Sequence, residues 1–166
     1  AERQQNRRET VDRSDKINAY SRQVNEELMR LNVESDLSHE DTLDGYGQFL
    51  STKRQEMVNE HKGSDDSKAI LSIRLQEIEN DVVGKAAGIS TRLGREKVLK
   101  TYNDRLSPLL SSVAKDPSRQ SIDKAFLNLE TSINDLSGAF DPGEEENLLR
   151  RTGQEQIALS AVNSLI

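Results

Sequence analysis

The strongest constraint on the fold of this chain is a run of apolar residues at steps of three and four through its middle. The run begins with Leu71, Leu75, Ile78, Val82, Ala86, Ile89 and Leu93, and it continues through Leu99, Tyr102, Leu106, Leu109 and Val113. Steps of three and four place side chains on one face of an α-helix. The spacing predicts a helix over residues 66–115, about 70 Å long. We expect a kink near Pro108, because proline removes a backbone donor and clashes with the preceding turn.

The rest of the chain shows the same helical periodicity and no strand alternation. Further helices are predicted over residues 1–35, 39–62, 118–137 and 142–166. The breaks between the helices fall at Leu37, Gly63, Asp116-Pro117 and Asp141-Pro142, and the last three contain turn-forming residues. Short connections make neighbouring helices antiparallel. The expected fold is therefore all-α, an elongated bundle of about five helices or helical hairpins around one long central helix. We expect residues 1–166 to form a single helical domain or a segment of a longer chain.

Ten apolar residues are the predicted packing or interface positions. They are Leu71, Leu75, Ile78, Val82, Ile89, Leu93, Phe126, Leu129, Ile133 and Leu165. Those on the long helix should be buried against the first two helices, while Arg74, Glu77 and Lys85 should face solvent or the charges of a neighbouring subunit. The small residues from Gly84 to Ser90 are expected to let another helix approach closely. Gly45 and Gly47 either admit a close helix or mark an irregular turn.

Composition excludes several classes of function. The chain has 166 residues and no Cys, so disulfides, thiolate zinc sites, iron–sulfur clusters and Cys nucleophiles are excluded. Its hydrophobic fraction of 33% favours an elongated or partner-dependent helical assembly over a compact enzyme. The net charge of −6 argues against broad binding to DNA phosphates, although a local DNA contact is left open. No apolar run is long enough to span a membrane.

The sequence offers no recognisable catalytic, cofactor-binding or metal-binding residues. The two histidines, His39 and His61, fall near predicted helix ends, where a solvated or cap-proximal role is expected. No histidine stands at a position that would activate a serine. Most carboxylates alternate with Lys and Arg opposite the apolar stripe, which is typical of a solvated face. We therefore expect no enzyme activity, no cofactor, no metal and no small-molecule ligand.

The first ten residues are polar and carry no apolar stripe. Basic and acidic residues alternate there and just beyond: Arg3, Arg7, Arg8 and Arg13 with Glu2, Glu9, Asp12 and Asp15. In a nucleic-acid-binding arm, fewer acidic residues would offset the Lys and Arg residues. This segment is interpreted as an exposed, charged start of a helix.

Residues 102–166 combine a leucine pair, two Asp-Pro joints and a Glu-rich last helix that ends in Leu-Ile. The positions that carry this pattern are Leu109, Leu110, Asp116, Pro117, Leu136, Gly138, Asp141, Pro142, Glu145, Ala161, Leu165 and Ile166. The pattern resembles a region of the large tail, internal-virion and DNA-ejection proteins of bacteriophages, and residues 12–31 share the likeness more loosely. These residues form structural joints and include no catalytic group.

The resemblance implies a non-enzymatic virion component that oligomerises through helical packing to form or line a DNA-delivery assembly. Its partners would be further copies of itself and other virion proteins. It would reside in the virion and, after ejection, in the host cell envelope or periplasm. Two alternatives fit similar helices: the extracytoplasmic four-helix-bundle sensor domain of a bacterial chemoreceptor, and a flagellar hook-associated helical segment. Transmembrane helices flanking the chain in its parent gene would identify the sensor domain.

Overall fold

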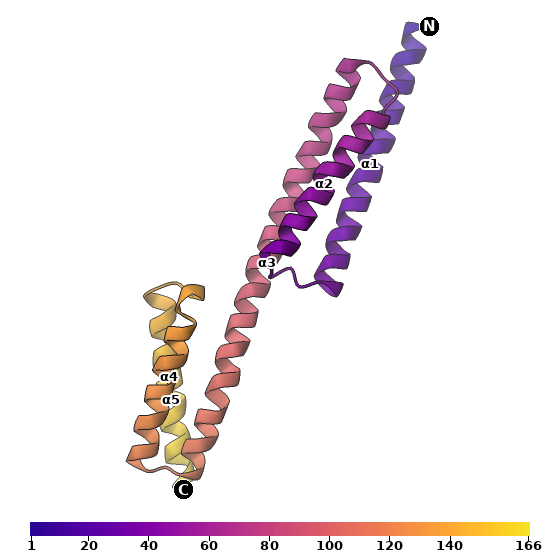
Figure 1. Ribbon diagram of the computed structural model, residues 1–166. Coiled ribbons are helices and arrows are strands. Elements are labelled where there is room, and N and C mark those ends of the chain that lie inside the picture. Colours follow the sequence, from indigo (N-terminus) through magenta and orange to yellow (C-terminus); the bar gives the residue numbers. More distant parts are fainter. The chain divides into compact units, whose positions relative to one another are not determined.

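The computed structural model describes residues 1–166 and contains five α-helices and no strand. The helices are α1 (Glu2–Glu34), α2 (Glu40–Glu60), α3 (Asp65–Lys115), α4 (Arg119–Asp135) and α5 (Glu144–Ser164), with a short 3-10 turn η1 (Ser137–Ala139) between the last two (Figure 1). The predicted all-α fold is confirmed, and each predicted helix lies within a few residues of an observed one. None of the helices is both long and apolar enough to cross a membrane.

The chain divides into two compact units, Ala1–Gly94 (unit 1) and Arg95–Ile166 (unit 2). Helix α3 contributes its first part to unit 1 and its last part to unit 2. The apolar stripe of α3 looks continuous in the sequence, but no residue between Ala86 and Tyr102 is buried. That interruption gives the chain two separate hydrophobic cores. Pro108 lies inside α3 and does not end it.

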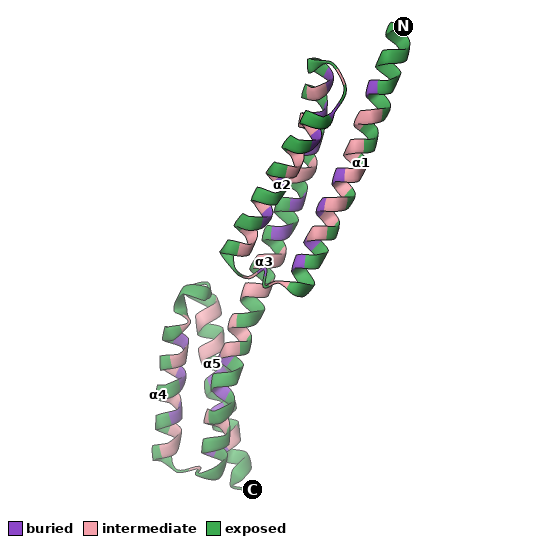
Figure 2. Ribbon diagram, turned by 45° about the vertical axis from the view of Figure 1, so that its right-hand side comes forward, coloured by how far each residue is buried: buried purple, intermediate pink, exposed green.

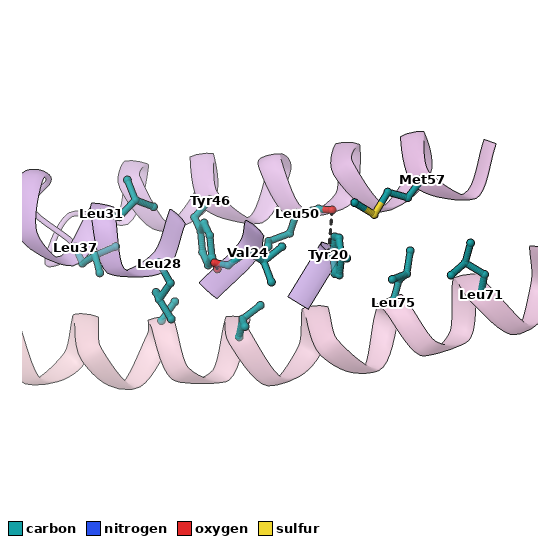
Figure 3. Packing of buried hydrophobic residues seen from close by; sticks show 12 residues of the cluster. Tyr20, Val24, Leu28, Leu31, Leu37, Tyr46, Leu50, Met57, Leu71 and Leu75 are labelled. Carbon is teal, nitrogen blue, oxygen red and sulfur yellow. Dashed lines mark hydrogen bonds between the residues drawn. The ribbon is translucent and has the colours of Figure 1, made fainter. Parts of the chain in front are cut away.

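Unit 1 is built from α1, α2 and the first part of α3, which lie side by side (Figures 1 and 2). Its buried core consists of Tyr20, Val24, Leu28, Leu31, Leu37, Tyr46, Leu50, Met57, Leu71, Leu75, Val82 and Ala86 (Figure 3). Of the residues predicted on the long helix, Leu71, Leu75 and Val82 are buried here. Ile78, Ile89 and Leu93 are half-buried and pack against this core. The charged face with Arg74, Glu77 and Lys85 is exposed.

Two tyrosines cross-link α1 and α2 within this core. The Tyr20 hydroxyl on α1 donates to the Leu50 carbonyl on α2 at 3.1 Å, and the Tyr46 hydroxyl on α2 donates to the Val24 carbonyl on α1 at 2.6 Å (Figure 3). Burial raises the pKa of Tyr46 to about 12, and it raises the pKa of Tyr20 further. Both phenols are therefore held in the protonated form that makes these bonds.

Unit 2 is built from the last part of α3, α4 and α5. Its core consists of Tyr102, Leu106, Val113, Ala125, Leu129, Ile133, Ile157 and Ala161. Among the predicted packing residues, Leu129 and Ile133 are buried and Phe126 is half-buried against them. Leu165 is 73% exposed and lies outside the core. It follows the buried Ala161 by four residues, but it is the C-cap residue of α5, where the helix ends.

Helix α5 approaches its neighbours closely at Gly153. A β-carbon at Gly153 would lie 2.6 Å from the Tyr102 hydroxyl oxygen and 2.8 Å from a methyl group of Leu129. The small residues from Gly84 to Ser90 were predicted to let a helix approach closely, and Gly45 and Gly47 were predicted either to do so or to mark an irregular turn. A β-carbon at Gly45, Gly47, Gly84 or Gly88 would meet nothing within 4 Å, so within this chain no helix approaches those glycines closely.

Candidate functional site

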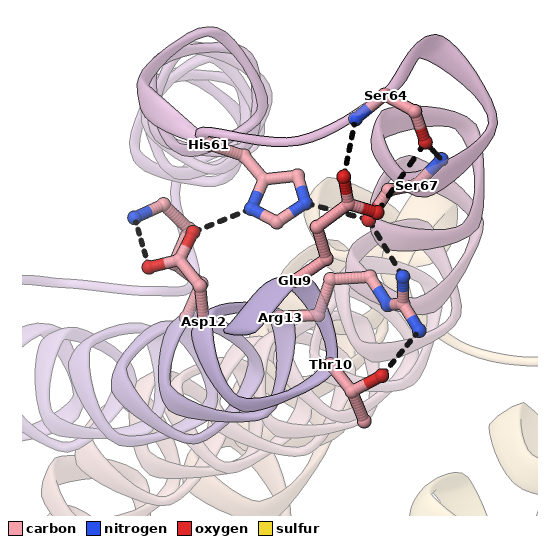
Figure 4. Close-up of polar contacts among 8 residues, drawn as sticks. Glu9, Thr10, Asp12, Arg13, His61, Ser64 and Ser67 are labelled. Carbon is pink, nitrogen blue, oxygen red and sulfur yellow. Dashed lines mark hydrogen bonds and ion pairs between the residues drawn. The ribbon is translucent and has the colours of Figure 1, made fainter. Parts of the chain in front are cut away.

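The buried polar and charged residues of the chain gather at one place, where α1 meets the turn between α2 and α3. They are Glu9, His61 and Ser67. Together with Asp12, Arg13 and Ser64 they form what we call the polar cluster (Figure 4). Glu9, Asp12 and Arg13 come from α1, whereas His61, Ser64 and Ser67 come from the turn and from the first turn of α3. Buried polar groups need partners, and each of these has one.

His61 is the centre of a chain of hydrogen bonds. Its Nδ1 lies 2.5 Å from Asp12 Oδ2, and its Nε2 lies 2.7 Å from Ser67 Oγ. A neutral imidazole that donates from Nδ1 to the carboxylate accepts the Ser67 hydroxyl hydrogen at Nε2. Ser67 Oγ in turn accepts a hydrogen bond from Arg13 Nη1 at 2.6 Å. In this arrangement each of the three hydrogen bonds joins one donor to one acceptor.

The Asp12 carboxylate is held in its charged form. Its pKa lies below the usual value, chiefly because His61 donates a hydrogen bond to it, and Lys16 adds an ion pair at 3.3 Å. Burial acts in the opposite direction and is outweighed. The carboxylate is thus anchored from α1 by Lys16 and from the turn by His61.

Glu9 caps the N-terminus of α3 from another helix. Its carboxylate accepts the Ser64 backbone N–H at 3.1 Å and lies 3.4 Å from the Ser64 hydroxyl oxygen. Ser64 Oγ itself accepts the Ser67 backbone N–H at 3.2 Å. The first N–H groups of a helix lack intrahelical partners and carry partial positive charge, so a carboxylate there is favourable. Glu9 therefore joins α1 to α3 across 55 positions of sequence.

The order of groups, Asp12–His61–Ser67, is that of a carboxylate, a base and a hydroxyl nucleophile in acyl-transfer enzymes. The expectation that no histidine could activate a serine was wrong in this geometric sense. His61 was correctly expected near a helix end, as it follows Glu60 at the end of α2, but it is buried rather than solvated. The His61–Ser67 pair spans one turn and was within reach of sequence reasoning. Asp12, 49 positions from His61, gave no such signal.

A nucleophile also needs an open face from which a substrate can approach. Ser67 is 2% exposed, and Arg13 occupies its hydroxyl oxygen. On the His61 side, a β-carbon at Gly63 would lie 2.6 Å from Nε2, so the turn itself covers the imidazole. Asp12 and Arg13 of α1, which bond to His61 and Ser67, also cover these two side chains. The polar cluster is therefore a contact between α1 and the α2–α3 turn.

Two of the hollows on the surface of unit 1 have similar volumes. One, of about 560 Å³, runs between α2 and α3 and is lined by small and apolar residues that include Gly47, Ala86 and Ala87. The other, of about 600 Å³, lies beside the polar cluster and mixes charges of both signs, including Arg8, Glu9, Asp12 and Lys62. No group of three or more His, Cys, Asp or Glu side chains is arranged to hold a metal ion.

A second feature with functional meaning is an apolar face on α5 in unit 2. Leu148, Leu159 and Val162 are 53%, 58% and 54% exposed. They lie on the opposite side of the helix from its buried residues Gly153, Ile157 and Ala161. We call these three side chains the outer face of α5. Leu165, predicted as a packing or interface residue, is also exposed in the last turn.

Comparisons with known proteins return no relative: no family model, curated protein or solved structure matches the chain. The fold and the site define an all-α protein of two helical units, with a polar contact in one and an uncovered apolar helix face in the other. Its function has to be argued from these features and from the resemblance of residues 102–166.

Proposed function

We propose that the chain is a non-enzymatic structural component of a bacteriophage virion, of the internal, ejection or tail class. It oligomerises through helix packing to form or line a DNA-delivery assembly. The resemblance of residues 102–166 to such proteins suggests the class. The outer face of α5, which lies within that same segment, supports the mode of action.

The observation that carries the proposal is the outer face of α5. A helix that is apolar on one side can bury that side against the core of its own unit. Helix α5 is apolar on two opposite sides, and the core covers one of them. Its inner side packs in unit 2 through Ile157 and Ala161, and its outer side exposes Leu148, Leu159 and Val162. In a chain with only 33% hydrophobic residues, three exposed aliphatic side chains on one helix face favour packing against another subunit.

The charge of the chain fits a protein that surrounds DNA without holding it. The net charge is −6, with 29 acidic residues against 23 Lys and Arg. Affinity for duplex DNA comes largely from Lys and Arg contacts with phosphates. An acidic assembly would bind passing DNA weakly and would let it move.

Oligomerisation is tested by native mass spectrometry and light scattering across a concentration series. We expect the unmodified chain to form oligomers and the double variant Leu159→Ser/Val162→Ser to weaken them at least about tenfold in dissociation constant. Gln156→Ser, on the same helix and exposed, is the matched control and should leave the oligomers unchanged. A monomer at every concentration would contradict the proposed mode of action.

Location distinguishes the virion proposal from its two alternatives. An antibody raised against the purified chain is applied to gradient-purified virions, to host membranes and to isolated flagella. We expect signal in the virions. Signal confined to membranes would favour the chemoreceptor sensor domain, and signal confined to flagella would favour the hook-associated segment.

A further inference from the structure

We propose that residues 2–16 of α1 form a releasable arm, which detaches from the α2–α3 turn as a unit while the apolar core of unit 1 stays folded. The polar cluster is the latch that holds this arm closed. The proposal concerns unit 1 alone and does not depend on the function proposed above.

The arm contributes nothing to the hydrophobic core. Its one buried residue is Glu9, and Val11, its one large apolar side chain, is 60% exposed. Contacts of α1 with the apolar core begin only at Ile17 and Tyr20. Because apolar burial is the main favourable term in folding, the arm lacks the contribution that fixes the rest of α1.

Three polar contacts join the arm to the turn. Glu9 meets Ser64, Asp12 meets His61, and Arg13 meets Ser67. Each contact replaces hydrogen bonds to water, so its net contribution to stability is small compared with its strength in isolation. Each also involves a charged side chain of α1, namely Glu9, Asp12 or Arg13. A segment held only in this way opens at a lower free energy than a segment that is packed into the apolar core.

The arm keeps its own helical interactions when it leaves the turn. Lys16 pairs with Asp12 at 3.3 Å, and Gln5 lies 3.4 Å from Glu9, both at the i,i+4 spacing that stabilises a helix. These contacts lie within the arm and do not depend on α2 or α3. Release uncovers His61 and the backbone N–H of Ser64 that Glu9 covers. Because an isolated helix of this length is only marginally stable in water, the released arm frays and its amides exchange with solvent.

The rest of unit 1 is held by different contacts. From Tyr20 onward α1 is packed through Val24, Leu28 and Leu31, and the Tyr20 and Tyr46 hydroxyls bond across to the opposite helix. Local opening free energies within one protein range from near zero up to the global value. The boundary between the arm, which is held by polar contacts, and the part of α1 that is packed into the apolar core falls between Lys16 and Tyr20.

Hydrogen exchange measured by mass spectrometry on the full chain tests the proposal. The test variant is Glu9→Gln/Asp12→Asn, which weakens two latch contacts. The matched control is Glu2→Gln/Asp15→Asn, which removes the same two charges from exposed positions of the same segment. We expect the test variant to accelerate exchange in residues 2–16 at least about tenfold and to leave residues 20–31 within about twofold. The control should leave both segments within about twofold of the unmodified chain.

Two results would overturn the proposal. Equal acceleration in residues 2–16 and 20–31 would show that arm and core open together as one unit. Unchanged exchange in residues 2–16 would show that the polar cluster does not hold the arm. Because the chain has no Cys, spin labels on Gln5→Cys and Lys62→Cys give an independent distance across the hollow beside the cluster. That distance should lengthen in the test variant and stay unchanged in the control.

Discussion

Unit 1 and unit 2 each pack three helical segments, but they join them by opposite means. In unit 1 large side chains fill the space between α1 and α2, with Tyr20 and Tyr46 spanning it. In unit 2 a missing side chain, at Gly153, lets α5 lie directly against Tyr102 and Leu129. An interface filled by large side chains is destabilised when a substitution removes atoms and leaves a cavity. An interface in which backbones lie close together is destabilised when a substitution adds atoms. The two units should therefore respond differently to the same kind of substitution.

The largest effect is expected from removing a fully buried leucine in unit 1. Leu75→Ala should lower the free energy of unfolding by about 2–5 kcal/mol, because Leu75 is completely buried and its loss leaves a cavity. The half-buried Ile78 should cost less when cut to Ala. Denaturant unfolding gives the total loss, and hydrogen exchange assigns it to a unit. If Leu75→Ala loosens unit 2 as strongly as unit 1, the two cores are not separate in energy.

Adding a single methyl group should damage unit 2. Gly153→Ala places a β-carbon against the Tyr102 hydroxyl and Leu129, and we expect a loss of about 1–3 kcal/mol from overpacking. Gly88→Ala in unit 1 is the matched control, since its β-carbon would meet open space. That change should stabilise α3 by about 0.5–1 kcal/mol, through better helix propensity. Thermal unfolding of both variants measures the sign, and a stabilising Gly153→Ala would refute the close approach.

Alkaline pH should weaken unit 1 through its tyrosines. Burial raises the pKa of Tyr46 from 10.0 to about 12, so the folded state keeps the phenol proton more tightly than the unfolded state. The resulting stability is fully present below pH 10 and is lost as pH rises from 10 toward 12. Tyr46→Phe should cost about 0.5–1.5 kcal/mol at pH 7, through the lost hydrogen bond to the Val24 carbonyl. Urea unfolding at pH 9 and pH 11 should show a smaller loss in Tyr46→Phe than in the unmodified chain.

The smallest effect is expected on the charged face of α3. Arg74 and Glu77 form an ion pair at 3.3 Å in which both side chains are about 60% exposed. Exposed ion pairs contribute little to stability, so Glu77→Ala should change the free energy of unfolding by no more than about 0.5 kcal/mol. Denaturant unfolding measures it beside Leu75→Ala. A loss comparable to that of Leu75→Ala would mean that this face is covered by a partner.

The helices were predictable because their signals are local. Apolar spacing, the two Asp-Pro joints and Gly63 placed all five helices to within a few residues. The division into two units was not predicted, since it depends on which apolar residues find partners. Leu99 continues the sequence stripe of α3, yet it is not among the buried residues. Leu165 looked equivalent to Ile157 in the sequence, but it caps the end of α5 and is exposed there.

The polar cluster and the close approach at Gly153 were missed for a related reason. Both depend on residues far apart in the chain: Asp12 with His61, and Gly153 with Tyr102. The glycines of α2 and α3 attract attention in the sequence because several occur close together, but Gly45, Gly47, Gly84, Gly88 and Gly94 have open space around them. Gly153 stands alone in a polar stretch and carries no local sign of its neighbour.

The three tyrosines of the chain all make the same kind of bond. Tyr20 donates to the carbonyl of Leu50, Tyr46 to that of Val24, and Tyr102 to that of Leu149, each on a neighbouring helix. Contacts between aliphatic side chains are non-directional, so they do little to prevent a helix from sliding along its axis. A hydroxyl aimed at one carbonyl does not, because a shift of one residue moves the acceptor by about 1.5 Å. The tyrosines thus fix the axial register of the helices. Although the chain has few aromatic residues, each of its three tyrosines opposes sliding of one helix along another.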